Sequence, residues 1–290
     1  MNLPPILIDP LSVGSVLLRP MFNDLPLAAA TGFIVQGISG QLLITNRHVV
    51  TGRDNQTELP LDAHASIPNR IAITHVSAVD PIAWTETIED LYLDENDETP
   101  RWIEHPHWKN KADVVALPLS VKGVKNVAPY DIGAMNADIL VGPTAGISVI
   151  GFPFGKTASD NLAIWSTGFM ASEHGANYEN LPVFLISCHT RSGQSGSPVV
   201  AYRTGSFLDS AGSFAITNGR VVRFLGVYSG RIHRDSDIGM VWKKEVVHEI
   251  ITAAGYQNPK PIAIGGSLTY KTGDLPSTLG LSALMPKALK

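Results

Sequence analysis

A serine with glycines on either side is a candidate nucleophile. Ser195 lies in residues 191–198, which read RSGQSGSP, and the apolar run Val-Val-Ala follows directly. A serine hydroxyl attacks a carbonyl when a base takes its proton and backbone N–H groups stabilise the oxyanion that forms. Gly193 can adopt conformations closed to other residues, so its N–H and that of Ser195 can converge on one point. The stretch predicts a nucleophile with an oxyanion hole at Gly193 and Ser195; the alternative is an ordinary Gly/Ser-rich turn.

A histidine and an aspartate earlier in the chain are suited to serve that serine. His48 follows the apolar run 42–44 in the segment TNRHVV, and an imidazole, with a pKa of about 6.5, can take a proton and return it. Asp113 stands directly before the apolar run 114–119, where its carboxylate could orient the imidazole and stabilise the imidazolium. Each residue alone also fits a structural role at the end of a strand.

The elements around these residues are short and mostly extended. Long amphipathic helices are scarce; the exception is 243–254, where Val246, Val247, Ile250 and Ile251 fall on one helical face. Many short strands at this spacing are typical of a β-sandwich or β-barrel protein. Apolar runs bounded by Gly, Pro, Asn or Asp recur at residues 30–35, 41–45, 71–76, 114–119, 147–150, 184–187, 199–202, 221–228 and 238–242.

Structure-breaking residues divide the chain into two halves of similar size. Residues 120–144 hold several glycines and prolines and no long periodic run, which favours a connection between domains. We expect an N-terminal domain over 1–125 with His48 and Asp113, and a C-terminal domain over 126–257 with Ser195 and the helix. Residues 258–290 are predicted to be an extended tail.

The candidate residues belong to a set of motifs that resembles a known family. The motifs are TGF at 31–33, TNRHVV at 45–50, ADVVAL at 112–117, GFPFG at 151–155, GQSGSP at 193–198 and GVYSG at 226–230. In this order they resemble the trypsin-like serine peptidases, most closely the disulfide-poor bacterial and HtrA-like members, over about residues 28–254. The order histidine, aspartate, serine also differs from that of α/β-hydrolases.

The resemblance implies a fold, a reaction and roles for the site residues. The implied fold is all-β, with two six-stranded antiparallel β-barrels of the trypsin-like kind and a C-terminal helix. His48 would be the general base, Asp113 the residue that orients it, and Ser195 the nucleophile, with Gly193 and Ser195 N–H groups as oxyanion hole. The enzyme would be a serine endopeptidase that hydrolyses a polypeptide substrate through an acyl-enzyme. It would require no metal and no cofactor.

Two departures from the family bear on activation. Residue 194 is Gln, where relatives activated from zymogens place an aspartate that pairs with a newly cut N-terminus. A basic cleavage site followed by an apolar start does not precede the first strand. We therefore expect either a chain that is synthesised in an active form or one that is activated by a protein partner.

The sequence defines the residues of the primary specificity pocket less well than the catalytic residues. Its offset from the nucleophile places His189 near the floor, with walls from Tyr228, Ser229, Gly230 and Arg231 and from residues 238–240. An aspartate that would select Lys or Arg is absent from these positions. One hypothesis is that His189, helped by Arg231 or Arg234, favours an acidic or amide side chain. The alternative is that His189 points elsewhere and the pocket prefers small apolar groups.

The composition of the chain limits which binding partners and which cellular location are expected. The 290 residues carry a net charge of −4 and no Lys/Arg stripe, which makes nucleic acid an improbable partner. Cys188 is the single cysteine, so an internal disulfide cannot form and a cytoplasmic location is expected. No run approaches about 18 consecutive apolar residues, so we expect no membrane association.

Three other functions compete with the peptidase. Residues 150–157 end in Gly-Lys-Thr as phosphate-binding loops do, but Ile150 stands where such a loop needs glycine and Pro153 removes an N–H. His105 and His107 could bind a metal in a metallohydrolase, although a His-x-His pair alone is weak evidence. The third alternative is a trypsin-fold binding or scaffolding module whose site is conditionally inactive.

Overall fold

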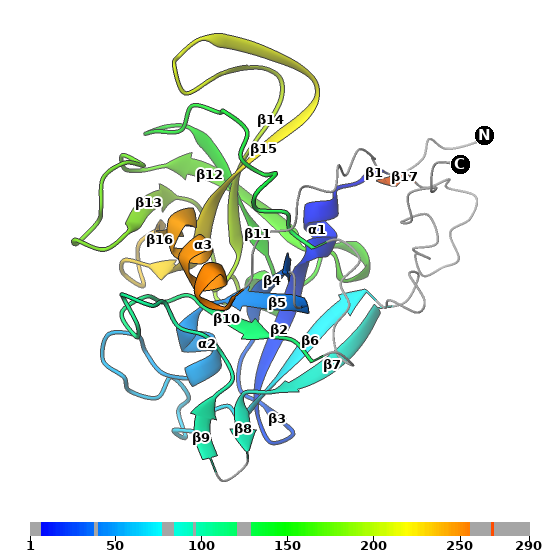
Figure 1. The fold of residues 1–290 in the computed structure, drawn as a ribbon, viewed down its shortest axis with the longest axis vertical. Coiled ribbons are helices and arrows are strands. Elements are labelled where there is room, and N and C mark those ends of the chain that lie inside the picture. The colour runs from blue at the N-terminus through cyan, green and yellow to red at the C-terminus, as the bar shows by residue number, and fades with distance from the viewer. Residues whose placement is uncertain are drawn as a thin grey trace.

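Two antiparallel β-sheets, one from each half of the chain, form the body of the protein (Figure 1). The structure is a computed structural model that describes residues 7–37, 40–76, 84–94, 97–120, 129–255 and 268–269. The strands coincide with short apolar runs bounded by turn-forming residues, and continuous runs of this kind are typical of strands that are buried on both faces.

The first sheet has seven strands in the order β10-β5-β4-β2-β6-β7, with β3 paired to β2. They are β2 (Ser15–Phe22), β3 (Leu25–Pro26), β4 (Ala30–Gly37), β5 (Gly40–Thr45), β6 (Arg70–Val76), β7 (Trp84–Asp90) and β10 (Val115–Pro118).

Strands β4 and β5 are buried on both faces. Ile34 and Leu43 belong to the core enclosed by the first sheet, whereas Phe33 and Ile44 belong to a core shared with the second half of the chain. The Phe33 and Phe224 rings meet across that boundary with their centroids 5.6 Å apart. Burying a large apolar side chain contributes about 1.5–3 kcal/mol. This packing fixes the two halves against each other beside the strands that lead to His48.

Side chains link the two ends of the first sheet. Glu89 on β7 is buried, and its Oε1 accepts hydrogen bonds from Ser120 N at 2.9 Å and Ser120 Oγ at 2.8 Å. Arg101 pairs with Glu89 Oε2 at 3.1 Å and donates to Pro118 O at 3.3 Å. A buried carboxylate needs such partners, and these bring the end of β10 to β7 without a backbone ladder between them.

The second sheet is a closed six-stranded barrel in the order β11-β12-β13-β16-β15-β14. Its interior is filled by apolar side chains such as Val149, Phe184 and Leu225. The strands are β11 (Gly146–Gly151), β12 (Ile164–Met170), β13 (Val183–Ser187), β14 (Pro198–Leu208), β15 (Phe214–Arg231) and β16 (Ile238–Lys243).

Short elements complete the described part. The C-terminal helix α3 (Lys244–Ala253) buries the four residues Val246, Val247, Ile250 and Ile251 in the shared core, as its sequence pattern predicts. The others are α1 (Pro10–Gly14), α2 (Arg47–Thr51), the 3₁₀ turns η1 (Pro153–Gly155) and η2 (Ser159–Asn161), and the strand pairs β1 (Leu7–Ile8) with β17 (Leu268–Thr269) and β8 (Tyr92–Asp94) with β9 (Asp97–Pro100).

The predicted all-β class with one antiparallel sheet in each half and a C-terminal helix is confirmed; the second sheet closes into the predicted six-stranded barrel, whereas no backbone ladder closes the first within the described residues. The first sheet has seven strands where six were expected, because the short β3 folds back on β2. The predicted boundary near residue 125 lies outside the described residues. Of the predicted tail, only residues 268–269 are described, and they pair with β1.

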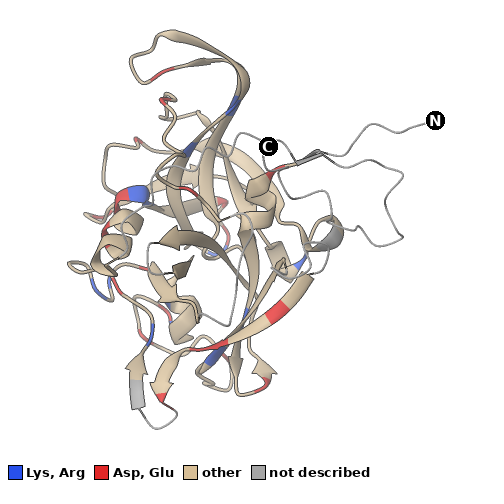
Figure 2. Cartoon of the chain, turned by 45° about the vertical axis from the view of Figure 1, so that its right-hand side comes forward, with Lys and Arg blue, Asp and Glu red and all other residues tan. Residues whose placement is uncertain are grey.

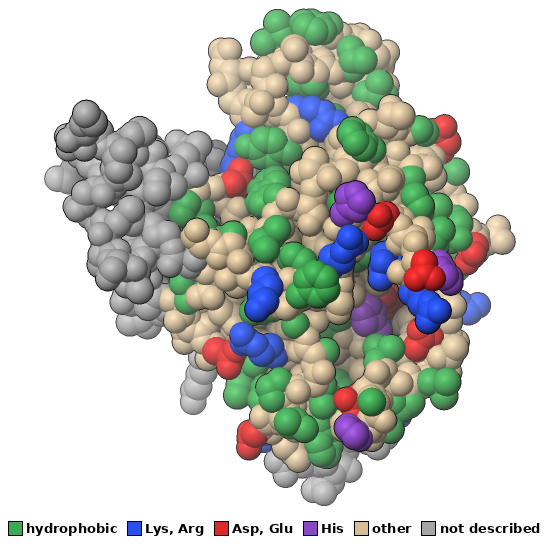
Figure 3. All heavy atoms as spheres, turned by 180° about the vertical axis from the view of Figure 1, so that it is seen from behind, with side chains coloured by type: hydrophobic (Ala, Val, Ile, Leu, Met, Phe, Trp, Pro, Cys, Tyr) green, Lys and Arg blue, Asp and Glu red, His purple; other side chains and the backbone are tan. Residues whose placement is uncertain are grey.

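A long hairpin, formed by β14 and β15, extends beyond the second barrel (Figure 1). Its outer end carries the exposed side chains Leu208, Phe214 and Ile216, and Figure 3 shows hydrophobic side chains gathered there. Charged residues of both signs are spread over the described elements (Figure 2). Among those elements, no helix has the length and apolar character needed to cross a bilayer.

Candidate active site

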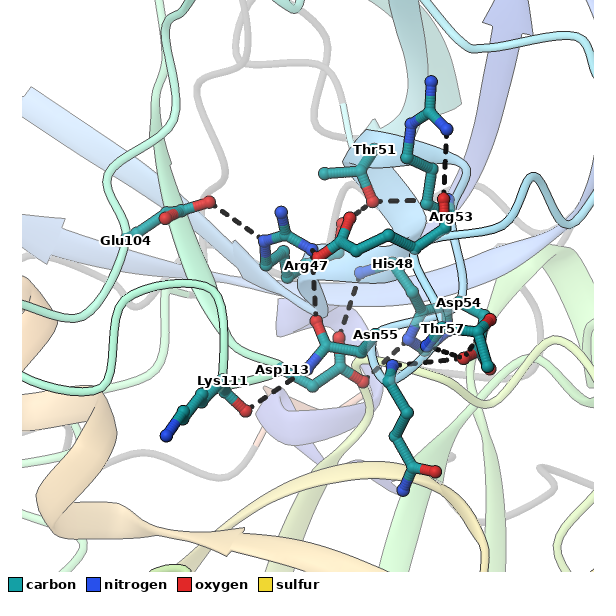
Figure 4. Close-up of polar contacts among 12 residues, drawn as sticks. Arg47, His48, Thr51, Arg53, Asp54, Asn55, Thr57, Glu104, Lys111 and Asp113 are labelled. Carbon is teal, nitrogen blue, oxygen red and sulfur yellow. Dashed lines mark hydrogen bonds and ion pairs between the residues drawn. The ribbon is translucent and has the colours of Figure 1, made fainter.

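His48 and Asp113 meet in the first half of the chain (Figure 4). His48 Nδ1 lies 2.7 Å from Asp113 Oδ2, and the backbone N–H of His48 donates to Asp113 Oδ1 at 2.9 Å. Both carboxylate oxygens of Asp113 therefore hold the same residue. With Nδ1–H donated to the carboxylate, Nε2 carries the lone pair that a general base needs.

The local fold explains why the two residues come together. Strand β5 ends at Thr45, Asn46 follows, and His48 lies in the first turn of the short helix α2. Asp113 lies two residues before the start of β10, which pairs with β5 in the register Val115 to Thr45. Asn46, fully buried, donates from Nδ2 to the Asp113 carbonyl at 2.6 Å and locks the two segments together.

Opposing effects set the protonation of His48. Burial disfavours the imidazolium and by itself would lower its pKa. The charge of Asp113 and its hydrogen bond, with a smaller contribution from Asp54, outweigh burial, so the pKa of His48 is raised above 6.5. Asp54 lies on the neighbouring loop, where its carboxylate accepts from Thr57 N at 2.8 Å (Figure 4). The site thus favours a histidine that gains a proton readily when a serine gives one up.

Ser195 lies in the loop between β13 and β14, and two glycines give this loop its shape. Gly193 has φ +94° and Gly196 has φ +87°, conformations that residues with side chains rarely adopt. A Cβ on Gly196 would stand 2.1 Å from Thr31 O, and one on Gly193 would stand 2.4 Å from Phe152 O. The loop therefore packs directly on β4 and on the turn after β11, and both contacts require glycine.

The backbone of this loop offers two free donors. In the described part of the chain, neither Gly193 N–H nor Ser195 N–H has a hydrogen-bond partner. The Ser192 carbonyl accepts from Phe154 N at 2.5 Å, which turns that carbonyl toward the Phe152–Gly155 turn. In a trans peptide the N–H points opposite to the C=O, so the Gly193 N–H faces away from the turn. Two unpaired amides close to a serine can serve as the donors of an oxyanion hole.

Neutral hydrogen bonds anchor the loop at Gln194. This side chain is fully buried, with Oε1 accepting from Arg191 N at 2.8 Å and Nε2 donating to Ser166 Oγ at 3.0 Å. An amide whose donor and acceptor are both paired needs no counter-charge. The position where zymogen-activated relatives place an aspartate is therefore satisfied within the chain.

Two cavities bring the predicted site residues together. His48, Gly193 and Ser195 line one cavity of about 290 Å³, with residues 27–30 and 61–63 on its other walls. A second cavity of about 720 Å³ is lined by His48, Asp113 and residues 229–232. His48 therefore borders both cavities, whereas Ser195 lines the first and Asp113 the second.

Comparison with protein families decides the class of this domain. A model of the trypsin-like peptidase domain matches residues 30–208, more than half of the chain. This chain belongs to the trypsin-like peptidase family. The matched segment contains every predicted catalytic residue, and it covers strands from both sheets. A search of curated proteins finds no match.

Proteases are among the solved structures that are similar to this chain. The Rv3671c protease of M. tuberculosis in its inactive form is 15% identical, with a TM-score of 0.47 over 84% of this chain and 90% of that one. Its active form is 17% identical, with a TM-score of 0.44 over 87% and 85%. The serine endoprotease from Yersinia pestis is 10% identical, with a TM-score of 0.46 over 83% and 62%.

The predicted specificity residues of this peptidase domain are not all in one place. Ser229, Gly230 and Arg231 line the larger cavity. Tyr228 is buried, and its hydroxyl bonds Thr190 Oγ1 at 2.7 Å. His189 has an 82% exposed side chain, with Nδ1 3.0 Å from the Asp237 carboxylate. The structure thus places His189 at the surface and a tyrosine ring beneath the loop.

The segments considered as a phosphate-binding loop and as a metal site have structural roles in the fold. Residues 150–157 form the end of β11 and the turn η1, and the next regular strand is β12, where a phosphate-binding loop would open a helix. His105 is buried, with Nδ1 accepting from His107 N at 3.1 Å and Trp108 N at 3.0 Å. Within the described residues no group of three or more His, Cys, Asp or Glu side chains is arranged to hold a metal.

Two site residues had no assigned role in the sequence analysis. Asn46 supports Asp113, and Asp54 contributes to the pKa of His48. A signal existed for Asn46, because it lies inside the TNRHVV motif and an asparagine between apolar runs must find buried partners. Asp54 sits in a polar loop whose path the sequence does not specify.

Proposed function

We propose that this chain is a serine endopeptidase that cleaves polypeptides through an acyl-enzyme formed on Ser195. The observation that carries the proposal is the joint placement of four groups at one cavity. These are the His48 imidazole already bonded to Asp113, the half-buried Ser195, and the unpaired N–H groups of Gly193 and Ser195. Base, nucleophile and oxyanion donors are the parts that acyl transfer needs.

The reaction would follow from these groups. Ser195 Oγ attacks the peptide carbonyl while its proton passes to His48 Nε2, and the carbonyl oxygen takes up negative charge facing the Gly193 and Ser195 amides. His48 then gives the proton to the leaving amine. Water attacks the acyl-enzyme by the same route, with His48 again as base. No step draws on a metal or a cofactor.

The loop that carries Ser195 supports activity without a cut N-terminus. Gln194 finds both of its partners in Arg191 and Ser166, and the Gly193 N–H keeps no partner within the described residues. These bonds leave an activating protein partner without an evident task at this loop. We therefore expect the full chain alone to be competent.

A small apolar side chain at the cleaved position suits the specificity region best. The buried Tyr228 ring lies against Gly239, where an added Cβ would stand 2.6 Å from the ring, and its hydroxyl is tied to Thr190. The ring thereby takes space in which a long substrate side chain would lie. A preference for acidic or amide groups would need His189, whose side chain is directed to Asp237. Profiling of a peptide library tests this: small apolar groups before the scissile bond, unchanged by His189→Ala, are expected, whereas an acidic preference lost in that variant contradicts it.

The compartment follows from the single cysteine. Cys188 is buried and free, and burial raises the pKa of its thiol to about 11, so it is a poor nucleophile. A chain that relies on no disulfide is suited to the reducing cytoplasm. Fractionation of cells that express the protein tests the location.

Labelling with a fluorophosphonate tests the catalytic assignment. Stable reaction with this probe requires an activated serine, so wild-type protein should be labelled and the modified peptide should contain Ser195. Ser195→Ala should abolish labelling, whereas Ser210→Ala, at the end of the β14–β15 hairpin, should leave it intact. A folded wild-type protein that resists the probe would instead be a trypsin-fold binding or scaffolding module.

A further inference from the structure

Thr31 joins the two halves of the site through its backbone and its hydroxyl. It is the second residue of β4 in the first sheet and is fully buried. Its N–H donates to Ser195 O at 2.9 Å, and its Oγ1 donates to Gly193 O at 2.8 Å. The same Oγ1 accepts from Phe152 N at 3.1 Å. Thr31 thus contacts the loop of the nucleophile and the turn on which that loop packs.

The hydroxyl of Thr31 fixes the peptide planes on both sides of Gly193. Its direct bond to Gly193 O holds the plane between Gly193 and Gln194. Its bond from Phe152 N places the Phe152–Gly155 turn, whose Phe154 N–H in turn holds Ser192 O at 2.5 Å. The second contact sets the plane that carries the Gly193 N–H. One hydroxyl therefore determines the direction of that N–H, although it is not itself among the groups that line the cavity.

The remaining bond of Thr31 leads to the base. Thr31 O accepts from Thr45 Oγ1 at 2.8 Å, and Thr45 is the last residue of β5, three residues before His48. Thr45 also pairs with Val115 at the start of β10, next to Asp113 and Val114. The oxyanion loop and the strand that delivers the base thus share one residue as their common support.

We propose that Thr31 is a positioning residue that sets the oxyanion hole by aligning the Gly193 amide with the Ser195 amide. The inference rests on the proposed function, because it concerns the donor pair of that reaction. Thr31 does not line the cavity that holds His48, Gly193 and Ser195, so it would act through the loop and not on the substrate. Its effect should appear in the chemical step, since misplacement of a catalytic group by about 1 Å can cost about 10²-fold in rate.

Three substitutions at one position separate alignment from simple stability. Thr31→Val is close to isosteric and removes the hydroxyl, Thr31→Ser keeps it, and Thr31→Ala serves if valine prevents folding. We expect kcat of the valine or alanine variant to fall about 10²-fold at nearly unchanged KM. The serine variant should stay within about threefold of wild type. Affinity for a peptide trifluoromethyl ketone, whose hemiketal oxyanion mimics the charged intermediate, should fall in parallel with kcat.

A control hydroxyl outside the site tests the effect of losing one side-chain hydrogen bond. Ser148 on β11 is buried and its Oγ lies 3.0 Å from Thr167 Oγ1 in the second barrel. Ser148→Ala should lower Tm and leave both kcat and the affinity for the ketone unchanged. Kinetics are measured well below the Tm of each variant, so that unfolded protein does not contribute.

The outcomes distinguish this inference from the proposed function. Wild-type protein that turns over a peptide, with a valine or alanine variant that keeps kcat within threefold, overturns the role of Thr31 alone. The same holds if the serine variant loses as much as the other two, or if the loss lies entirely in KM. Wild-type protein that neither cleaves peptides nor reacts with a fluorophosphonate overturns the proposed function instead.

Discussion

The two halves of the site are held by different forces. In the first half, His48 and Asp113 are joined by side-chain hydrogen bonds of 2.7 Å and 2.9 Å, and charge attraction raises the pKa of the histidine. In the second half, the loop of Ser195 is held by backbone carbonyls, the Thr31 hydroxyl and the neutral Gln194 amide. If the groups act as proposed, charge sets the protonation of the base, whereas neutral hydrogen bonds and close packing place the nucleophile and its amides.

Removing the charge in the first half should have the largest effect. Asp113→Asn keeps the size of the side chain but loses the acceptor charge and stabilises the wrong tautomer of His48. We expect kcat/KM to fall about 10⁴-fold. Peptide hydrolysis at neutral pH measures it, with the near-ultraviolet circular dichroism spectrum as a check of the fold. A loss below tenfold would show that Asp113 does not orient the base.

Disturbing the shape of the second half should have a smaller but still large effect. Gly193→Ala places a methyl group where Phe152 O lies 2.4 Å away, at a backbone angle of φ +94°. The Gly193 amide must move, and loss of one oxyanion donor costs about 10²- to 10³-fold in kcat. Gly142→Ala is the matched control, because nothing lies within 4 Å of its added Cβ. Equal activity of the two variants would mean that the loop tolerates another conformation.

The pH dependence of the reaction tests the role of charge through a smaller expected effect. The base works only when deprotonated, and the pKa of His48 is raised above 6.5, so kcat/KM should rise with pH through a midpoint above 6.5. Asp54→Asn removes one of the charges that raise this pKa and should move the midpoint down by a few tenths of a unit. Asp209→Asn, on the hairpin, should not move it. A wild-type midpoint below 6.5 would contradict the assigned balance of burial and charge.

The same contrast explains what the sequence could predict. His48 and Asp113 are recognisable because each side chain carries its own chemistry and stands at the end of an apolar strand. Gly193 was identifiable because its motif demands a conformation that only glycine adopts readily. The contribution of Thr31 could not be identified from the sequence, since its partners are Gly193 O, Ser195 O and Phe152 N, all more than 120 residues away in sequence.

The specificity region shows what the sequence could not predict, which is the direction of side chains in loops. An offset from Ser195 suggested a floor at His189, but the direction of a loop side chain depends on its neighbours, and Asp237 draws this one to the surface. Tyr228, which was predicted as a wall of the pocket, is buried and bonded to Thr190. The pattern of apolar residues along the chain predicted the sheets and the terminal helix well, because it reports burial directly. It does not report where a loop turns its side chains.

The most direct test of the account is whether His48 and Ser195 act as one unit. His48→Ala, Ser195→Ala and the double variant are compared by kcat on the same peptide, with the fold of each checked. Each single change should lower kcat about 10⁵- to 10⁶-fold. The double variant should have a kcat no lower than the single variants, because either change alone already abolishes the function that the two residues perform together. Losses that multiply in the double variant, or a Ser195→Ala enzyme that keeps a tenth of its activity, would contradict it.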